Sequence, residues 1–368
     1  MDVKIIDNLN YEETAKVLLE SYVPQWGLVG TPNWNASYVE HLDKSYVKPN
    51  NGPYVGVFDG DKLIGIGMGA ISNWKVAEVG DVKTINICNL GVLPSYQRKG
   101  IATSIVEELI KAVTGKVDFA YRICNEGLND HLVLSNKCGF VKKIDNVNQV
   151  AKIMGKDMVS KAVKFRELGK VMAQLIKTVA GLPKEENKIQ EGIIRDGSLA
   201  DMKQIKEIMD KYQENATILK TSSEVELKNI IESMELLDNV KFSKLFRVWE
   251  KDGVIQAFVL GRYEPINYNA GEVVMPIVSD VGFASELDRK TRTSFVVSLI
   301  YEFKEKVPEA FGTNIASAHL DEKAIGKAGY NDDRSTRPLF AKLLSEKLKD
   351  WFETNWNKNR VYSILYQR

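Results

Sequence analysis

The sequence predicts an α/β protein made of two tandem copies of one fold, each a mixed β-sheet flanked by helices. Three observations lead to this fold class. They are a buried strand followed by a tight turn and an amphipathic helix near residue 100, a hairpin pattern upstream of it, and an internal repeat at a shift of 191 residues. At 368 residues the chain is long enough for two domains, each with its own core.

The first predicted elements follow the order strand, helix, hairpin. Residues 3–6 form a candidate strand, and the spacing of apolar residues predicts a helix over 11–22. Two apolar runs, 54–58 and 63–68, flank an acidic turn that contains Gly60, so this region predicts a β-hairpin.

A strand, a turn and a helix then follow in close succession. The strand is predicted over 84–92, and the helix has one apolar face, formed by Ile101, Ala102, Ile105, Val106, Leu109, Ile110 and Val113. Between them, 98–103 places backbone N–H groups at a helix N-terminus, and Gly100 gives close access to the backbone. Because free N–H groups and the helix dipole both favour negative charge, this turn suits a diphosphate. Arg98 and Lys99 add two cations.

These residues carry a resemblance to a known family. The run Val92-x-Pro94-x-x-Gln97-Arg98-Lys99-Gly100-Ile101-Ala102 resembles motif A of GNAT-superfamily N-acetyltransferases. In that family the turn holds the pyrophosphate of acetyl-coenzyme A (acetyl-CoA), and the preceding strand hydrogen-bonds the pantetheine. The implied fold is two tandem GNAT-like mixed sheets flanked by helices. The residues implied in binding acetyl-CoA are Leu90, Gly91, Val92, Gln97, Arg98, Lys99, Gly100, Ile101, Ala102, Thr103 and Asn129.

The elements after this motif fit the same family. A strand is predicted over 117–121 and a short helix over 129–137. The ending Leu134-Ser135-Asn136-Lys137-Cys138-Gly139-Phe140 resembles the family signature Leu-Tyr-x-x-x-Gly-Phe, with Ser135 in place of the usual tyrosine.

The internal repeat lays 54–69 over 245–260, and 91–94 over 282–285. The phosphate-binding chemistry is not repeated, because Thr291 falls on Gly100 and would place a β-branched side chain where the backbone must approach phosphate. Asp288 falls on Gln97 and would repel the same phosphate. The second copy is therefore expected to keep the scaffold without binding acetyl-CoA. Its possible tasks are to complete the acceptor pocket, to stabilise the first copy, or to form a dimer interface.

These patterns divide the chain into three parts. Residues 1–150 are predicted to form the acetyl-CoA-binding GNAT acetyltransferase domain, 151–189 a helical connector and linker, and 190–368 a degenerate GNAT-like domain. Near the end of the chain the sequence predicts a helix over 338–356 and a strand over 360–366.

Two side chains are candidates for catalysis in the helix over 129–137. Ser135, in the tyrosine position, is a far poorer proton donor than a phenol. It is expected to hydrogen-bond the sulfur, to relay a proton through water or to have no role, with a direct role as the acid as the alternative. His131 lies beside the same site and is a candidate base, although an exposed helix position is the alternative. Cys88 is expected to be a small buried apolar residue rather than a nucleophile.

No carboxylate lies within 84–92, where the family resemblance places a general base. Glu78 and Asp81 precede that strand and are candidates, with surface solvation as the alternative role. Resemblance to tandem members of the superfamily implies one more candidate base, the terminal carboxylate at Arg368. The alternative is that this terminus is frayed and solvated.

Aromatic residues are frequent before the hairpin, in a segment interrupted by glycines and prolines. They are Tyr22, Trp26, Trp34, Tyr38, Tyr46 and Tyr54. They are expected either to line a pocket for an amine with an apolar or planar body or to pack the two copies together. Since few acids lie nearby, a polycationic acceptor is disfavoured.

Composition excludes several classes of function. With 50 basic and 49 acidic residues, neither nucleic acid nor a membrane is an expected partner. Three cysteines without a CxxC pair indicate a reduced, cytoplasmic setting, and the start of the chain lacks the apolar run of a signal peptide. The three scattered histidines have no metal-ligand spacing, so no metal is expected.

The function predicted from the residues and the resemblance is N-acetyltransfer. Acetyl-CoA is the expected co-substrate, and the acceptor is a primary amine of a small molecule or a peptide N-terminus, which receives the acetyl group by direct transfer. One alternative is a sensor that binds acetyl-CoA without turning it over, and another is transfer of a longer acyl chain, as in tandem members that resemble N-myristoyltransferases. A homodimer is possible.

Overall fold

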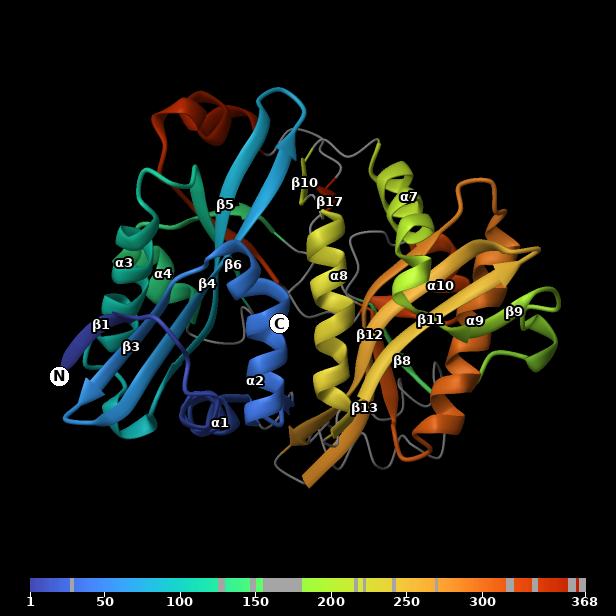
Figure 1. The fold of residues 1–368 in the computed structure, drawn as a ribbon, viewed down its shortest axis with the longest axis horizontal. Helices are drawn as coiled ribbons and strands as arrows, with labels where there is room; N and C mark the ends of the chain where they lie inside the picture. Colours follow the sequence, from blue (N-terminus) through green and yellow to red (C-terminus); the bar gives the residue numbers. More distant parts are fainter. Residues whose placement is uncertain are drawn as a thin grey trace, which may run out of the picture.

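The chain forms two mixed sheets that lie side by side, with α2 (Ala36–Leu42) and α8 (Glu224–Ser233) between them (Figure 1). This computed structural model describes residues 1–368 except 27–29, 125–129, 146–149, 155–180, 215–217, 221–222, 240–242, 269–270, 316–320, 333–336, 357–361 and 364–368. The predicted fold class, two tandem mixed sheets flanked by helices, is confirmed.

The first sheet has the order β1-β3-β4-β5-β6-β16-β7. Its neighbours are antiparallel except for β5 and β6, which are parallel. The strands are β1 (Asp2–Ile6), β3 (Tyr54–Asp59), β4 (Lys62–Val76), β5 (Gly80–Val92), β6 (Phe119–Ile123), β7 (Val141–Ile144) and β16 (Leu339–Leu343). The helices of this half are α1 (Tyr11–Trp26), α2, α3 (Ile101–Val113) and α4 (Asp130–Cys138).

The second sheet has the order β15-β8-β14-β13-β12-β11-β9. The strands are β8 (Val150–Ile153), β9 (Ile193–Asp196), β11 (Ser243–Lys251), β12 (Val254–Tyr268), β13 (Gly271–Phe283), β14 (Gly312–Ile315) and β15 (Asn331–Asp332). The helices are α7 (Met202–Gln213), α8, α9 (Arg289–Lys306) and α10 (Glu322–Lys327). Because β13 begins and ends 191 residues after β5, the repeat seen in the sequence is a repeat of structure.

The two copies exchange strands reciprocally. β16, from the second half of the chain, pairs with both β6 and β7 in the first sheet, whereas β8, from the first half, pairs with β14 and β15 in the second. A smaller exchange accompanies it, since β10 (Ile218–Lys220) pairs with β4, and β2 (Thr31–Pro32) pairs with β12. The sheets therefore do not follow the division of the sequence at 150 and 190.

The predicted helix over 338–356 is wrong in its first part, which forms β16. Leu339 and Ala341 are completely buried there, with hydrogen-bonded neighbours on both sides. An apolar run this short fits either a strand or a helix, and the gap between β6 and β7 decides in favour of the strand. Short helical turns follow at Glu346–Leu348 and Trp351–Asn355, and β17 (Tyr362–Ser363) runs parallel to β10. The predicted helical connector lies largely outside the described residues.

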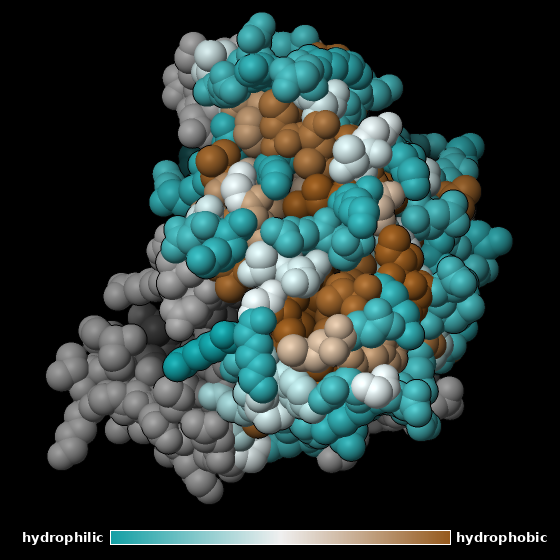
Figure 2. All heavy atoms as spheres, turned by 90° about the vertical axis from the view of Figure 1, so that its left-hand side faces the viewer, coloured by the Kyte–Doolittle hydropathy of each residue, from teal (hydrophilic) through white to brown (hydrophobic). Residues whose placement is uncertain are grey.

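The helix after the predicted phosphate turn covers one face of the first sheet. α3 buries the apolar face that its sequence predicts, apart from Ala102, which is half-buried. The opposite face is covered near β6 by the aromatic residues Trp351, Phe352 and Trp356, and the last two contact Phe119. On the outer side of this copy, apolar areas of the surface are separated by a band of hydrophilic side chains (Figure 2). No continuous apolar face is visible there.

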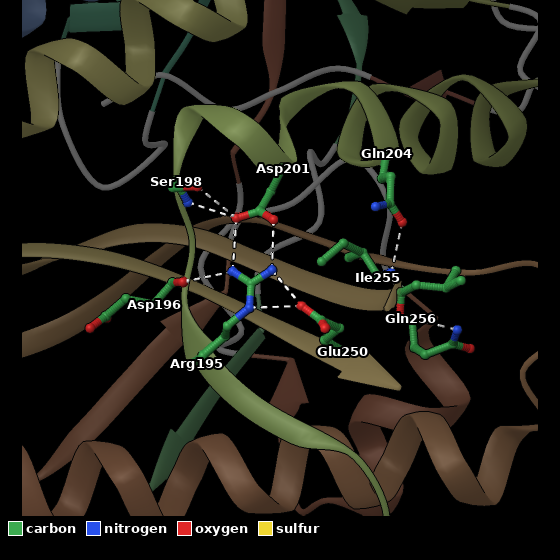
Figure 3. Close-up of polar contacts among 9 residues, drawn as sticks. Arg195, Asp196, Ser198, Asp201, Gln204, Glu250, Ile255 and Gln256 are labelled. Atoms are coloured by element: carbon green, nitrogen blue, oxygen red, sulfur yellow. Dashed lines mark hydrogen bonds and ion pairs between the residues drawn. The ribbon is translucent and has the colours of Figure 1, made fainter. Parts of the chain in front are cut away.

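An ionic network fixes the start of α7 in the second copy. Arg195 on β9 lies between two carboxylates, donating to Asp201 at 2.7 and 2.9 Å and to Glu250 at 2.6 and 2.9 Å (Figure 3). Asp201 also accepts from the Ser198 backbone at 2.8 Å in a capping box. The planar guanidinium thus joins β9, β11 and the helix start by charge-assisted bonds.

The strand exchange predicts that a fragment of residues 1–150 does not form the native first sheet. Without β16, β6 and β7 lose their common neighbour, and removal of Trp351 and Trp356 exposes the aromatic face of β6. We expect the fragment to self-associate, or to lack a cooperative urea transition, as followed by light scattering and circular dichroism. A monomeric fragment that unfolds cooperatively would contradict this.

The network at α7 predicts a pH-dependent contribution to stability. The bond from Arg195 holds the pKa of Asp201 below its usual range, so its stabilisation is complete above the unfolded-state value of ~3.9 and is lost as pH falls through the lower folded value. At pH 7, Asp201→Asn is expected to reduce the free energy of unfolding by about 1–3 kcal/mol, and the difference should close in acid.

Asp210→Asn is the matched control for this substitution. Asp210 is 58% exposed and pairs with Lys206 on the surface of the same helix, so its loss should change stability by less than ~0.5 kcal/mol. Equal effects of the two substitutions in urea unfolding would argue against a special role for the Arg195 network.

Candidate functional site

The turn between β5 and α3 leaves backbone donors open. It passes through a short turn at Pro94–Tyr96, and two residues adopt left-handed backbone conformations, Arg98 with φ 61° and Gly100 with φ 84°. Gly100 is the N-cap of α3, and no side chain caps the helix. A Cβ at Gly100 would meet no atom within 4 Å, so the space in front of this helix end is clear. Consecutive N–H groups in such a turn form a concavity that suits an anion.

Side chains around the turn hold it in place. Gln97 Nε2 donates to the Val92 carbonyl at 3.0 Å, and Tyr96 donates to Asp59 at 2.8 Å. The Lys99 ammonium lies 5.0 Å from the centre of the Tyr96 ring. Gln97 therefore fixes the end of β5 with its side chain and offers the turn only its backbone. Ile101 is buried in the core, so it too offers only its N–H group.

β5 and β6 separate just before this turn. Their parallel ladder runs from Thr84 opposite Phe119 to Asn86 opposite Tyr121 and goes no further among the described residues. At the point of separation, Arg122 Nη1 donates to the Ile87 carbonyl at 2.8 Å. Two residues later Asn89 has φ 48°, beside a register shift in the β4–β5 ladder, so the strand bends. A linear group could lie along the side of β5 that β6 leaves.

Helix α1 contacts β5 at two of the predicted pantetheine-binding residues. Tyr22 donates to the Leu90 carbonyl at 2.8 Å, and the Val92 N–H donates to Ser21 Oγ at 3.1 Å. A pantetheine bonded to these two backbone groups would have to replace both side chains. Asn129, the last predicted contact, lies outside the described residues.

The equivalent turn of the second copy is closed by its own side chain. The Asp288 carboxylate accepts from the Thr291 N–H and from Thr291 Oγ1, both at 2.9 Å, and caps α9. Arg292 ties the same turn to Asp321 at 3.1 Å and to the Ser285 carbonyl at 3.0 Å. The carboxylate thus occupies a place at which a phosphate would bind and adds a repelling negative charge.

The predicted catalytic residues of α4 are only partly described. Ser135 is half-buried, and its Oγ donates to Asn136 Oδ1 at 3.5 Å. His131 is part of α4, but its side chain lies outside the described part of the structure, as does Arg368. Glu78 and Asp81 lie exposed at the far end of the β4–β5 hairpin, and Asp81 is separated from Asn89 by roughly 26 Å of strand.

A buried acid that sequence reasoning missed lies on the first copy. Asp43 follows α2 and is only 2% exposed. Its Oδ2 accepts from the Tyr11 hydroxyl at 2.9 Å and its Oδ1 from the Tyr54 hydroxyl at 2.5 Å. No local pattern in the sequence marks Asp43, because its burial results from contact between α1, α2 and β3.

Cys88 lies near this acid. Burial raises the pKa of its thiol to about 11; the positive charge of Arg122 opposes the rise and the negative charge of Asp43 adds to it. Cys88 Sγ donates to the Met68 carbonyl at 3.5 Å, and Asn89 Nδ2 contacts Met68 Sδ at 3.3 Å. Because the thiol is protonated at neutral pH, Cys88 is not an activated nucleophile.

The aromatic segment before β3 packs the two copies together. Arg262 of β12 donates to the Tyr38 hydroxyl at 2.9 Å and pairs with the buried Glu264 at 2.5 Å. The Lys220 ammonium lies 5.8 Å from the Tyr46 ring. Burial, together with the nearby Arg262, lowers the pKa of His41 to about 3, so this imidazole is neutral. Of the two roles predicted for this segment, these contacts fit packing; the Trp26 side chain lies outside the described part.

A surface pocket of about 400 Å³ opens between the copies, beside α8. Its lining residues are Lys44, Lys48, Pro49, Asn229, Glu232, Ser233 and Leu236. Ser233 Oγ lies 2.5 Å from Ser45 Oγ, which in turn lies 3.3 Å from His41 Nδ1. The pocket wall is thus continuous with the buried polar contacts between the copies.

The described residues contain no cluster of three or more His, Cys, Asp or Glu that could hold a metal ion. Among their helices none combines the length and the apolar character needed to cross a bilayer.

Comparison with known proteins identifies the fold. Residues 15–134 match the sequence model of the Acetyltransferase (GNAT) family, while no protein with a curated description matches the chain. N-myristoyltransferase from Saccharomyces cerevisiae, solved with bound myristoyl-CoA and inhibitors, is similar with a TM-score of 0.69 and 15% identity, over 92% of this chain and 79% of that one. A second structure of that protein with bound myristoyl-CoA has a TM-score of 0.69 and 14% identity, over 92% and 82%.

A structure from another organism shows the same likeness. A conserved protein of unknown function from Enterococcus faecalis V583, described as a probable N-acyltransferase, has a TM-score of 0.54 and 12% identity, over 94% of this chain and 74% of that one. At such low identity these structures establish the fold, and the family match supports acyl transfer from an acyl-CoA as the type of reaction. The chain has the tandem GNAT-like fold, and its residues 15–134 match the GNAT acetyltransferase family model.

Proposed function

We propose that this protein is a cytoplasmic N-acetyltransferase that uses acetyl-CoA and a primary amine of a small molecule or peptide N-terminus. The observation that carries the proposal is the uncapped start of α3 at Gly100, placed at the end of a strand that has separated from its neighbour. These features suit the two parts of the co-substrate: the turn suits its diphosphate, and the side of β5 that β6 leaves suits its linear arm once Ser21 and Tyr22 give up their bonds to that strand.

Different groups of the first copy bind different parts of acetyl-CoA in this proposal. The N–H groups from Arg98 to Thr103 hold the diphosphate, with the cations of Arg98 and Lys99 at its edge. When bound, acetyl-CoA supplies the activated thioester. In this proposal the thioester lies beside the bend at Asn89, on the sheet face that carries Cys88, and positioning two reactants there is worth roughly 7–11 kcal/mol.

The packing beside the bend favours a short acyl group. Met68 is completely buried, and it contacts Cys88 through its carbonyl and Asn89 through its sulfur. A long acyl chain would need an apolar channel beside Met68 and Cys88, where these contacts lie. Transfer of a longer acyl chain remains the second candidate, because the fold is that of N-myristoyltransferase.

The second copy completes and stabilises the first in this proposal. It supplies β16 and β10 to the first sheet and Arg262 to the packing of α2, while Asp288 closes its own turn. One acetyl-CoA site per chain is therefore expected, rather than two.

Substitution at Gly100 tests the binding site. Gly100→Trp fills the space before α3 and should weaken acetyl-CoA affinity by about 100-fold or more in calorimetric titration, because contacts of the diphosphate with several N–H groups are lost. The wild-type protein should bind one equivalent. Unchanged affinity of the variant would refute the assignment of the site.

Gly115→Trp is the matched control. Gly115 also has positive φ, at 77°, and a Cβ there would likewise meet nothing within 4 Å, so the two variants carry the same backbone strain and bulk. Gly115 lies beyond the other end of α3, and its substitution should leave affinity unchanged. Equal losses in both variants would indicate a general effect on the fold.

Cys88 reports where the thioester lies. With a pKa of about 11, its alkylation by iodoacetamide should be slow at pH 7 and rise about tenfold per pH unit up to pH ~10. Saturating acetyl-CoA should protect it, as followed by peptide mass spectrometry that separates Cys88 from Cys124 and Cys138. Labelling at the rate of free cysteine, or no protection, would place the thioester elsewhere.

A further inference from the structure

A buried carboxylate with two tyrosine donors lies on the sheet face to which the proposed thioester is directed. Asp43 is 2% exposed and accepts one O–H bond at each oxygen, from Tyr11 at 2.9 Å and from Tyr54 at 2.5 Å. Burying an acid costs free energy even when it is hydrogen-bonded, and such arrangements often occur at functional sites. No carboxylate lies on β5 between Thr84 and Val92 to serve as a base, so a role in proton transfer is open to Asp43.

The ladders of the sheet place Tyr54 in line with the bend of β5. Tyr54 lies directly opposite Met68 on β4, and Met68 lies directly opposite Cys88 on β5. Residues opposite each other in antiparallel ladders project to the same face, so the three side chains form one row. Two strand spacings separate the backbones of Tyr54 and Cys88 by about 10 Å, with Met68 on the strand between them.

The electrostatic contacts agree with this placement. Burial raises the pKa of Tyr54, the hydrogen bond to Asp43 adds to the rise, and the nearby Cys88 thiol contributes. Asp43 in turn contributes to the raised pKa of Cys88. No described residue donates a hydrogen bond to the Tyr54 hydroxyl oxygen, which leaves that oxygen able to accept one.

Tyr11 differs from Tyr54 in its position rather than its chemistry. It belongs to the first turn of α1 and donates to the other oxygen of Asp43. It is not part of the row of Tyr54, Met68 and Cys88. Tyr11 therefore only orients the Asp43 carboxylate, and a substitution of Tyr11 is a matched comparison for the same substitution of Tyr54.

We propose that Tyr54 and Asp43 form the proton-accepting relay of this transferase: Tyr54 takes a proton from the acceptor ammonium and passes its own to Asp43. The inference rests on the proposed N-acetyltransfer. Tyr54 is the catalytic residue, because it contacts the amine. Asp43 acts through Tyr54 and positions it.

The relay moves two protons in one step. The ammonium N–H gives its proton to Tyr54 Oη as the Tyr54 proton moves to Asp43 Oδ1, so the amine gains a free lone pair and Asp43 becomes a neutral acid. The amine nitrogen then bonds to the acyl carbon, the carbon–sulfur bond breaks, and its electron pair leaves with sulfur. The second N–H proton neutralises that thiolate, giving amide and free thiol. Asp43 returns its proton through Tyr54 to solvent after the product leaves.

Charged and titratable groups face this relay from every element around it. Tyr11 comes from α1, Glu40 from α2, Cys88 from β5 and Arg122 from β6. Because burial and the bond to Asp43 raise the pKa of Tyr54, the hydroxyl stays neutral throughout, and the two proton movements must occur together. The relay therefore needs the hydroxyl itself, not a tyrosinate.

The test compares Tyr54→Phe with Tyr11→Phe in thiol release from acetyl-CoA. With the best primary amine from a panel at pH 7, Tyr54→Phe should lower kcat by about 100-fold or more, the range of general base catalysis. Tyr11→Phe removes a bond of the same kind from the same carboxylate but leaves the relay hydroxyl in place, so its loss of kcat should be at least tenfold smaller than that of Tyr54→Phe. Equal effects of the two would overturn the relay.

Hydroxylamine as the acceptor distinguishes a role of Tyr54 in proton transfer from a structural role. It is largely unprotonated at neutral pH and needs no base, so the defect of Tyr54→Phe should nearly vanish with it. With the primary amine, the defect should also shrink as pH rises toward the pKa of the amine. A loss that is equally large with hydroxylamine and constant with pH would show that Tyr54 has only a structural role.

Asp43→Asn provides the second variant, because an amide accepts the Tyr54 hydrogen bond but does not take its proton. It should reproduce the defect of Tyr54→Phe with the primary amine and recover with hydroxylamine. Titration of each variant with acetyl-CoA distinguishes failure of the proposed N-acetyltransfer from failure of the relay. Wild-type protein that fails to bind refutes the proposed function, whereas normal binding with unaltered turnover in Asp43→Asn refutes the relay alone.

Discussion

The reciprocal exchange of strands is the constraint on which the rest of the structure depends. β16 completes the first sheet and β8 the second, so that each half of the chain is held by ladders belonging to the other. The copies cannot separate without breaking main-chain hydrogen bonds and exposing the apolar faces beneath them. The exchange also holds α2 against β12, where Arg262 reaches Tyr38, and thereby sets the position of Asp43 at the end of α2.

The two copies are similar, but the helix that follows the central strand begins differently in each. Both have a long central strand followed by a turn and a helix, yet α3 begins at an uncapped Gly100 and α9 at Asp288, which accepts from Thr291. Four unsatisfied N–H groups begin every helix, and a carboxylate from the chain itself or an external anion can satisfy them. The first copy leaves these groups without a side-chain cap, whereas the second closes them with Asp288.

Local sequence patterns predicted most elements of the first copy, because the residues that determine each of these elements lie within one short segment. The period of the apolar residues in α3 and the glycine at its start are readable within about twenty residues, and the structure has both. The strand at Leu339–Leu343 was predicted as a helix, since only the distant gap between β6 and β7 favours a strand. The contacts of Ser21 and Tyr22 with β5, and the burial of Asp43, likewise depend on register between elements far apart in the sequence. The roles predicted for Ser135, His131 and Asn129 stay predictions.

The exchange of β16 has a consequence for the order in which the protein can fold. The gap between β6 and β7 stays unfilled until roughly 200 further residues have been made, which at ribosomal rates of about 5–20 residues per second takes ~10–40 s. Throughout that interval two strands present unpaired edges, and such edges invite pairing with other chains. Contacts of such wide sequence separation also slow the final step of folding. A nascent chain of this kind is a natural client for chaperones, and its yield should depend on the pace of translation.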